Sequence, residues 1–402
     1  MPGPGNCRSD TVTPPSRVVV VGASIGGITA AETLRREGFD GEIVVVGDEP
    51  HRPYLRPPLS KQILLGEWEP EQAFIQSVAQ TDELDIDLRT SCVALDLDVA
   101  GRVVQTSQGD LPYDELIIAT GSEPRRHPRL PSALTLRTMD DALNLRDGLQ
   151  SAHRVGVIGV GVLGSEIASA ARKYGAETLL IGRSASLTFG GVGALLSSRL
   201  IRLHEDNGVG LALRSEVVRA TPAGSRTSLE LADGRTELVD LMVAMIGSTP
   251  RTGWLHSSTL MIADGVVCDS FGGAAPGVSA VGDVAAWKDP FTGRHARVQH
   301  QSNAIEQAIA VALRIVHGEL GSQPVPFFWS EIHGVRINAF GWFDPARSLV
   351  AAEGESTDDA SVIFSRDATN QIRGVVGWNA HPREFRTARG TVLSQPVLTP
   401  SR

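Results

Sequence analysis

The chain is poor in cysteine: it has only Cys7, Cys92 and Cys268 among its 402 residues, and the three lie far apart. No two of them form a CxxC pair, which excludes a disulfide framework, a cysteine-based zinc site and an iron–sulfur ligand set. We therefore expect no bound metal. Any redox chemistry must then come from a bound organic cofactor.

Other features are missing as well. There is no apolar run of about 18 residues that could span a bilayer, so we expect a globular protein without a membrane partner. The formal net charge of -9 lacks the basic excess that nucleic acid binding needs. Residues 1–16 are rich in Pro, Gly and Ser and lack the apolar centre of a secretory signal. We interpret them as a disordered leader and expect a cytoplasmic protein.

Glycine is abundant, and its positions are informative. Residues 17–21 (RVVVV) predict a buried parallel strand, followed by the turn Gly22-Ala-Ser-Ile-Gly-Gly27 and a helix to residue 37. A second strand is predicted at residues 42–46, and Asp48 and Glu49 follow it at the spacing where a carboxylate reaches a ribose hydroxyl. Such a βαβ unit predicts a dinucleotide site at Gly22, Ser24 and Gly27, although Ser24 stands where a glycine would leave more room.

The same layout returns in the middle of the chain. Residues 153–159 (HRVGVIG) lead into Gly159-Val-Gly-Val-Leu-Gly164, a helix through residue 174 and a strand at residues 177–181. Gly159 would allow the sharp turn, Gly161 the close approach of the pyrophosphate, and Gly164 the contact between helix and strand. One such motif alone also occurs as an ordinary tight connection. Two, each with its strands and helix, predict two bound dinucleotides.

Two more predicted strands end in residues that are typical of a cofactor-binding site. Residues 116–121 (LIIATG) predict a strand that ends in the small turn Ala119, Thr120 and Gly121. Residues 277–284 predict a strand that brings Asp283 to its carboxyl end, where ligands of open α/β sheets bind. The alternative for Asp283 is an ordinary Gly-Asp turn.

Several further segments are more specific. They are GDEPHRPY (47–54), RPPLSK (56–61), LRTMDDA (136–142), Pro250, Asn303 and FWS (328–330). With the two glycine turns, they make the chain resemble the FAD- and NAD(P)H-dependent ferredoxin reductases of Rieske dioxygenases and bacterial cytochromes P450, such as putidaredoxin and rubredoxin reductases. The resemblance runs from about Arg17 to the 390s.

That resemblance implies an α/β fold with two Rossmann-like dinucleotide-binding domains, glutathione reductase-like, plus a C-terminal α+β domain. The FAD-binding domain would comprise residues 17–121 and 248–323. An NAD(P)H-binding domain, residues 122–247, would be inserted into it, and residues 324–402 would form the C-terminal domain. Electrons would pass from NAD(P)H through FAD to a [2Fe–2S] ferredoxin that feeds an oxygenase or a cytochrome P450.

The resemblance also implies the site. Lys61 and Glu166 would pair beside the flavin as catalytic residues, because an ammonium stabilises the negative charge of a reduced flavin. The alternatives are a solvated loop lysine and a surface glutamate in the first turn of a helix. The remaining cofactor contacts would be Asp48, Val93, Arg137, Asp283 and Gln301, joined by Glu49, Arg56, Gly121, Gly247 and Trp329.

The sequence departs from the family pattern in places. The second unit ends in Gly182-Arg-Ser184, where members that use NADH usually have an acidic residue. Arg183 suggests a 2′-phosphate and hence NADPH, the alternative being an ordinary loop arginine. The triplet Gln299-His-Gln301 stands where the family has Glu-His-Trp. The loss of the carboxylate and of the bulky aromatic ring would widen the flavin pocket, so the identity of the electron acceptor is left undecided. Leu55 and Arg251 are also unusual, and the sequence offers no mechanism for either.

The predicted acceptor would approach Trp329 and residues 381–386 (HPREFR), whose arginines would steer an acidic ferredoxin. The alternatives are that Trp329 is an ordinary core tryptophan and that residues 381–386 are a solvated charged tail. A disulfide reductase is excluded by the missing cysteine pair. Two other hypotheses stay open: a flavoprotein oxidase that acts on a small molecule, and a flavin-binding redox sensor resembling apoptosis-inducing factor. A monomer and a homodimer are both compatible with the sequence.

Overall fold

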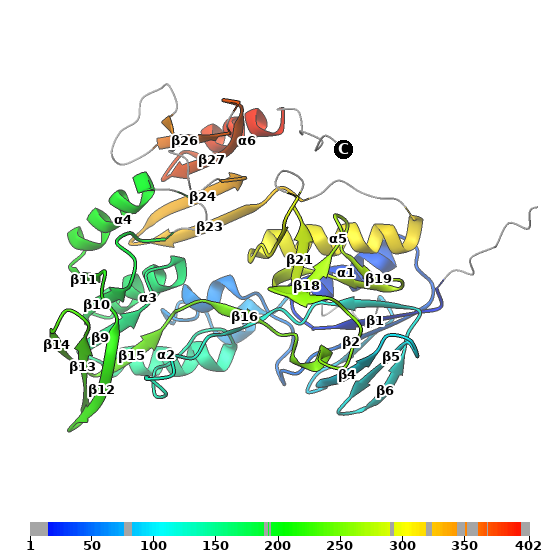
Figure 1. The fold of residues 1–402 in the computed structure, drawn as a ribbon, viewed down its shortest axis with the longest axis horizontal. Coiled ribbons are helices and arrows are strands. Elements are labelled where there is room, and N and C mark those ends of the chain that lie inside the picture. Colours follow the sequence, from blue (N-terminus) through cyan, green and yellow to red (C-terminus); the bar gives the residue numbers. More distant parts are fainter. Residues whose placement is uncertain are drawn as a thin grey trace, which may run out of the picture.

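The structure, a computed structural model, describes residues 15–75, 83–188, 192, 194–289, 293–318, 324–343, 350–351, 361–367 and 369–394. Residues 1–14 of the predicted leader lie outside this part. Ser16 is described, and its backbone N–H and hydroxyl both donate to Asp114 at 2.7 Å. Three bodies are visible in Figure 1: one on the right around β1, one at lower left around β9, and one at the top that carries α6.

The first body is built on a six-stranded sheet of order β19-β20-β7-β1-β2-β3, parallel except for the edge strand β19. Val18, Val19 and Val20 in β1 are fully buried, as expected of a strand covered on both faces. The strands are β1 (Arg17–Val21), β2 (Glu42–Val46), β3 (Ile86–Arg89), β7 (Glu115–Ile118), β19 (Gly273–Ala275) and β20 (Val278–Ala280).

Helices and small sheets cover this body. Helices α1 (Ile25–Arg36) and α5 (Gln301–His317) pack side by side on one face of the sheet. The three-stranded sheet β4 (Ala94–Asp98), β5 (Val103–Thr106) and β6 (Gly109–Pro112) shares the same hydrophobic core. A further sheet joins β17 (Ile262–Ala263), β18 (Gly265–Cys268), β21 (Ala285–Lys288) and β22 (His295–Ala296).

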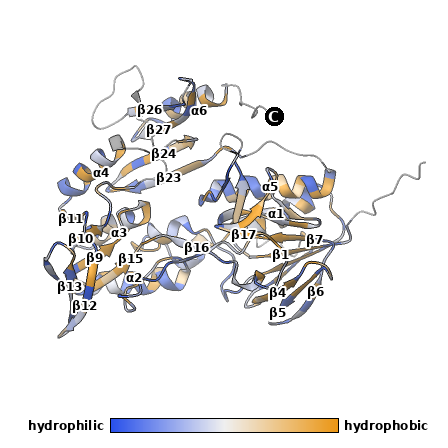
Figure 2. Cartoon of the chain, in the orientation of Figure 1, coloured by the Kyte–Doolittle hydropathy of each residue, from blue (hydrophilic) through white to orange (hydrophobic). Residues whose placement is uncertain are grey.

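The second body repeats the design. Its parallel sheet has the order β11-β10-β9-β15, and its inner strands are strongly apolar in Figure 2. The strands are β9 (Arg154–Ile158), β10 (Glu177–Gly182), β11 (Val209–Leu213) and β15 (Leu241–Ala244), with helices α2 (Met139–Ser151), α3 (Val162–Lys173) and α4 (Ala194–Asp206). An antiparallel sheet of β12 (Val217–Ala223), β13 (Arg226–Leu231) and β14 (Thr236–Val239) completes the body.

The chain passes between these two bodies twice, and the crossings lie together. Strand β8 (Ser122–Pro124) leaves the first body and β16 (Ser248–Pro250) returns to it, with Ser122 opposite Pro250 in an antiparallel pair. The two crossings therefore form a two-stranded antiparallel connection between the bodies. Domain boundaries at residues 122 and 247, which remain our proposal, would lie at these strands.

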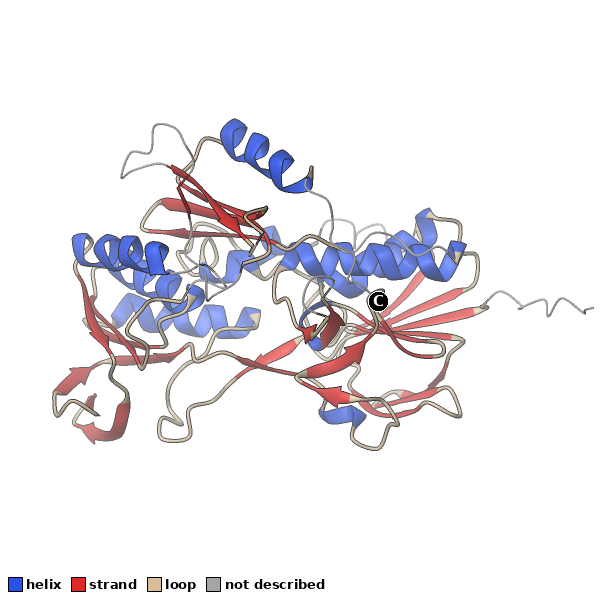
Figure 3. Ribbon diagram, turned by 45° about the horizontal axis from the view of Figure 1, so that its top comes forward, coloured by secondary structure: helices blue, strands red, loops and turns tan. Residues whose placement is uncertain are grey.

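The third body is an antiparallel sheet with one helix. Its order is β23-β24-β27-β26-β25, and α6 (Pro382–Leu393) packs on one face through Phe385, Ala388 and Val392 (Figure 3). The strands are β23 (Phe327–Ile332), β24 (Val335–Gly341), β25 (Val350–Ala351), β26 (Ser361–Arg366) and β27 (Ile372–Trp378). The opposite face joins the core of the second body, which brings β23 against α3. No helix of the described residues is long and apolar enough to cross a membrane.

A histidine pair lies between the second and third bodies. His204 on α4 is fully buried, and its Nδ1 lies 3.0 Å from Nε2 of His333 in the β23–β24 turn. The backbone N–H of His333 donates to Ser169 on α3. Burial, and to a smaller degree His333, lowers the pKa of His204 to about 3. Burial, with Arg172 and Lys173 nearby, lowers that of His333 to about 4.

We expect this pair to make the fold sensitive to mild acid. Both pKa values are depressed below the ordinary 6.5, so below that pH the unfolded chain binds protons that the folded chain does not. The resulting stability is present above pH 6.5 and is lost as the pH falls towards 4, by about 1.4 kcal/mol per pH unit for each histidine.

Urea unfolding between pH 7.5 and 4.5 would measure this loss. The control is the double variant His204→Gln/His333→Gln, in which the carboxylates that also titrate are unchanged. Its unfolding midpoint should vary less with pH than that of the wild type. Parallel pH profiles of the two proteins would contradict the assignment.

Candidate active site

The turn between β1 and α1 can be made only with glycine at two positions. Gly22 has a φ of 120°, and a Cβ there would lie 2.2 Å from the carbonyl oxygen of Ala119. A Cβ on Gly27 would lie 1.9 Å from the carbonyl oxygen of Gly22. Ser24 precedes the helix, and its side chain makes no capping hydrogen bond. The turn thus presents the first N–H groups of α1 to a ligand, which favours an anion.

A cavity of about 290 Å³ opens beside this turn. It lies at the carboxyl ends of β1, β2 and β7, which is where open α/β sheets bind ligands. The predicted cofactor residues that line it are Gly22, Ser24, Asp48, Glu49, Arg56, Val93, Ala119 and Thr120. Eight residues chosen from four separate segments of the sequence therefore meet at one cavity.

Near the cavity, Arg56 and Arg137 contact carboxylate and carbonyl oxygen atoms. Arg56 contacts Glu49 at 2.8 Å and donates to the carbonyl oxygen of Arg137 at 2.5 Å. Arg137 forms an ion pair with Asp283 at 3.1 Å, and Ser122 also donates to Asp283. Burial and the neighbouring Arg56 lower the pKa of Arg137.

These arginines retain unused hydrogen-bonding capacity. The buried Nε atoms of Arg56 and Arg137 have no partner in the structure. Arg56 lines the cavity beside a glycine turn that presents N–H groups, and Arg137 contacts Arg56. Such a group of donors suits a diphosphate, which offers the acceptors that both Nε atoms lack. The residues present therefore fit FAD.

Sequence reasoning missed two partners in this cavity. Arg251, for which no role was found, forms an ion pair with Asp48 at 2.7 Å and lines the cavity. Tyr54 donates to Glu49 and accepts from the backbone N–H of Met139. Tyr54 lies in the GDEPHRPY segment quoted for the resemblance, whereas no local signal pointed to Arg251.

The second turn, between β9 and α3, has the same geometry. Gly159 has a φ of 118°, and its Cβ would lie 2.0 Å from the carbonyl oxygen of Met245. A Cβ on Gly164 would lie 1.9 Å from the carbonyl oxygen of Gly159. Gly161 is unobstructed, its nearest neighbour being Thr188 at 3.8 Å. The first and third glycines are thus needed by the fold itself, and the middle one leaves space for a ligand.

Lys61 and Glu166 form an ion pair where the three bodies meet. Lys61 follows the 3-10 helix Pro57–Ser60 of the first body, and its Nζ lies 2.8 Å from Oε1 of Glu166 on α3. Glu166 also accepts from Ser60 at 2.5 Å and from Ser330 on β23 at 2.6 Å. The side chains of Lys61 and Glu166 are only 13% and 5% exposed, so neither is a solvated surface group.

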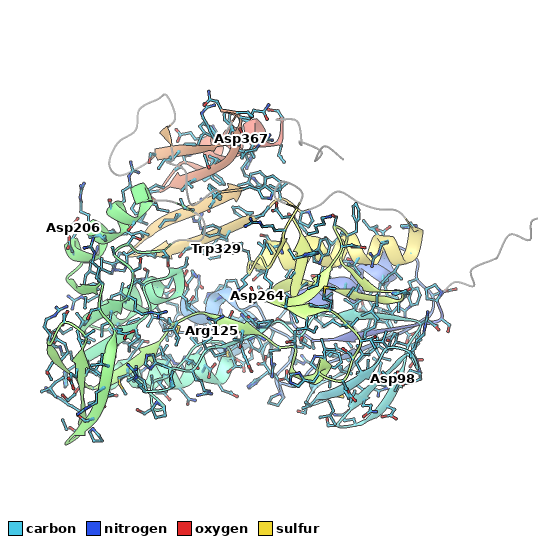
Figure 4. All side chains as sticks on the ribbon, viewed as in Figure 1. Asp98, Arg125, Asp206, Asp264, Trp329 and Asp367 are labelled. Atoms are coloured by element: carbon cyan, nitrogen blue, oxygen red, sulfur yellow. The ribbon has the colours of Figure 1, made fainter. Side chains whose placement is uncertain are left out.

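Trp329 lies next to this pair. Its ring centre is 4.9 Å from Nζ of Lys61, a cation–π distance, and the residue is 39% exposed. Figure 4 labels it on the edge strand β23, at the side turned towards the other two bodies. The lysine ammonium therefore contacts both a carboxylate and an aromatic ring.

The remaining predicted residues occupy the start of α5 and the crossing strands. Gln301 begins α5, and its buried Oε1 has no hydrogen-bond partner. His300 stacks on Phe328 at 4.7 Å, and burial lowers its pKa to about 4. Gly121 and Gly247 have φ angles of 70° and 94° at the ends of the two crossings. Arg183 is exposed just after β10.

Comparison with known proteins agrees with this architecture. Residues 16–308 match the family model described as pyridine nucleotide-disulphide oxidoreductase. The chain is 32% identical to the ferredoxin–NAD(+) reductase component of a p-cumate 2,3-dioxygenase system from Pseudomonas putida, over 96% of each chain. It is 34% identical to a terpredoxin reductase from a Pseudomonas species, over 87% of each.

Among solved structures, the chain is similar to putidaredoxin reductase in its covalent complex with putidaredoxin. The TM-score is 0.88 at 25% identity, with 96% of this chain and 95% of the other covered. The predicted fold class, two Rossmann-like dinucleotide-binding domains plus a C-terminal α+β domain, is confirmed by this likeness.

Proposed function

The chain belongs to the pyridine nucleotide-disulphide oxidoreductase family, and we propose from that premise how its site works. It is an FAD-dependent oxidoreductase that passes electrons from NAD(P)H to a [2Fe–2S] ferredoxin, which in turn serves an oxygenase or a cytochrome P450. One observation carries the mechanism. The buried ion pair Lys61–Glu166 joins the segment after the 3-10 helix Pro57–Ser60 to helix α3, which begins at the second glycine turn.

We propose that the first turn and its arginines hold FAD. The N–H groups after Gly22 would bind the pyrophosphate together with the guanidinium groups of Arg56 and Arg137, whose Nε atoms lack partners. Asp48 would accept from the ribose hydroxyls. Arg251 would then exchange its contact with Asp48 for a contact with the adenosine, because both line the same cavity.

We propose that the second turn holds the nicotinamide nucleotide. Gly159, Gly161 and Gly164 would bring the N–H groups of α3 to its pyrophosphate. The same helix carries Glu166 one turn further on, so binding of the nucleotide and placement of Lys61 depend on one element.

FAD, when bound, supplies a two-electron acceptor that can release its electrons one at a time. The protein contributes charge and position. Lys61 would hold a positive charge where negative charge develops during reduction, and Glu166 fixes its ammonium through an ion pair in a water-poor site. Ser60 and Ser330 in turn fix the carboxylate, so Lys61 needs no reorganisation during reduction.

The ferredoxin would dock near Trp329 and the start of α6. Arg383 and Arg386 are both exposed on that helix. Because the whole chain carries a formal charge of -9, attraction of an acidic partner must rely on such a local basic patch. We also propose a cytoplasmic location, where the nicotinamide donor is found and where free thiols such as Cys92 and Cys268 persist.

The test mixes the FAD-loaded protein with NADPH or NADH without oxygen and follows flavin absorbance by stopped flow. Addition of a [2Fe–2S] ferredoxin follows. We expect rapid bleaching and then reoxidation that depends on the ferredoxin. With Arg383→Glu/Arg386→Glu, bleaching should be unchanged and reoxidation slower, most clearly at low salt.

Other results would contradict the proposal. Slow bleaching with a persistent charge-transfer band would favour a redox sensor. Fast peroxide formation without a protein acceptor would favour an oxidase, for which the exchange to Gln299 and Gln301 would be the structural reason.

A further inference from the structure

The residue that follows β10 stands beside the second glycine turn. The backbone N–H of Gly159 donates to the carbonyl oxygen of Ile181 at 2.8 Å, so the ends of β9 and β10 are held together. In a βαβ unit, the group after the second strand meets the adenosine ribose. Here that group is Arg183, which is exposed, and the segment 182–188 (GRSASLT) contains no carboxylate to accept from a 2′-hydroxyl.

Neighbouring strands bring further arginines to the same edge. Ser215 donates through its N–H to the carbonyl oxygen of Gly182, and Arg214 donates through its N–H to that of Ser184, both at 3.0 Å. These bonds hold the backbone of Arg214, which is exposed just after β11, beside the segment 182–184 that carries Arg183.

The segment before α2 contributes a further arginine, Arg129. Burial lowers the pKa of His127, and the positive charges of Arg129 and Arg183 lower it further. Glu216 acts on His127 in the opposite sense. The charges that act on His127 are therefore two guanidinium groups and one carboxylate, and this excess of positive charge suits a phosphate.

We propose that Arg183, supported by Arg129 and Arg214, forms a site for the 2′-phosphate of NADPH, so that this chain takes NADPH in preference to NADH. The inference rests on the proposed function and names its electron donor. A guanidinium offers two parallel hydrogen bonds to a phosphate and gains little from a neutral hydroxyl. It would set the chain apart from relatives named for NAD(+).

Calorimetric titration with 2′,5′-ADP and with 5′-AMP tests the phosphate site without any turnover. We expect 2′,5′-ADP to bind at least about tenfold more tightly, with the difference shrinking as salt is added. Arg183→Ala should remove most of the difference. The matched control is Arg219→Ala, an exposed arginine on β12 of the same body, which should leave it unchanged. Equal binding of the two ligands by the wild-type protein would overturn the proposal.

The kinetic counterpart compares kcat/KM for the two nucleotides in flavin reduction. We expect NADPH to be favoured about tenfold or more, and Arg183→Asp to reverse the preference. If NADH is preferred and the ferredoxin still reoxidises the flavin, the inference fails and the proposed function stands. If neither nucleotide bleaches the flavin, the proposed function fails, and the ADP titration still decides whether the phosphate site exists.

Discussion

Replacing Glu166 by alanine is expected to lower the free energy of unfolding by about 3–5 kcal/mol and to slow flavin reduction by NAD(P)H. The substitution leaves the ammonium of Lys61 in a nearly closed site without its carboxylate, and an unpaired buried charge is costly. The hydroxyls of Ser60 and Ser330 lose their common acceptor in the same step. Because these groups belong to all three bodies, the junction between the bodies should loosen as well.

Three companion variants separate charge from structure. Glu166→Gln keeps acceptor and volume but not the charge, Lys61→Met removes the ammonium, and the double variant Lys61→Met/Glu166→Gln removes the pair. A double-mutant cycle on the free energy of urea unfolding should give a coupling free energy between Lys61 and Glu166 of about 1–3 kcal/mol. The double variant should be more stable than Glu166→Ala, because it leaves no unpaired buried charge.

The role beside the flavin is measured separately. Lys61→Met should lower the flavin reduction potential and the bleaching rate, because the positive charge that stabilises a reduced flavin is gone. If Lys61→Met reduced stability but left both the potential and the bleaching rate at their wild-type values, the ion pair would have only a structural role.

Gly27→Ala is expected to give a protein that does not retain FAD. Its Cβ would lie 1.9 Å from the carbonyl oxygen of Gly22, so the turn or α1 must shift away from the cavity. Gly26→Ala is the matched control one residue away, since its Cβ would meet nothing closer than 3.7 Å. We expect FAD affinity to fall by about tenfold or more for Gly27→Ala and to stay near the wild-type value for Gly26→Ala.

Flavin absorbance per mole of purified protein, together with circular dichroism, would measure this difference. The second turn provides an internal check. Gly164→Ala carries the same 1.9 Å clash and should disturb the second body, whereas Gly161→Ala has room for its Cβ and should weaken only nucleotide binding. Full flavin content in Gly27→Ala would show that this turn does not hold FAD.

The sequence by itself determined the two βαβ units. A buried strand, a glycine turn and a helix are local patterns, because each depends on residues within about 30 positions. Gly27 and Gly164 could be recognised for the same reason, because a Cβ on either would meet the carbonyl oxygen of the first glycine of its own turn. Gly22 and Gly159 could be recognised by their place in the same motif, although the carbonyl oxygens that exclude a Cβ there belong to Ala119 and Met245, which lie far along the chain. The family resemblance supplied Lys61 and Glu166 as a pair, a contact that no local pattern contains.

Only the tertiary structure decided which distant side chains meet. It joined Glu166 to Ser60 and Ser330, Arg251 to Asp48, and His204 to His333, in each case across more than 100 residues of sequence. Such contacts depend on how the three bodies pack against one another. Packing is set by the shapes of buried surfaces, and the sequence pattern does not show which of these surfaces meet. The sequence therefore determined the two glycine turns and, through the family resemblance, the cofactors to expect. The packing of the three bodies decided how Lys61 and Glu166 are held together.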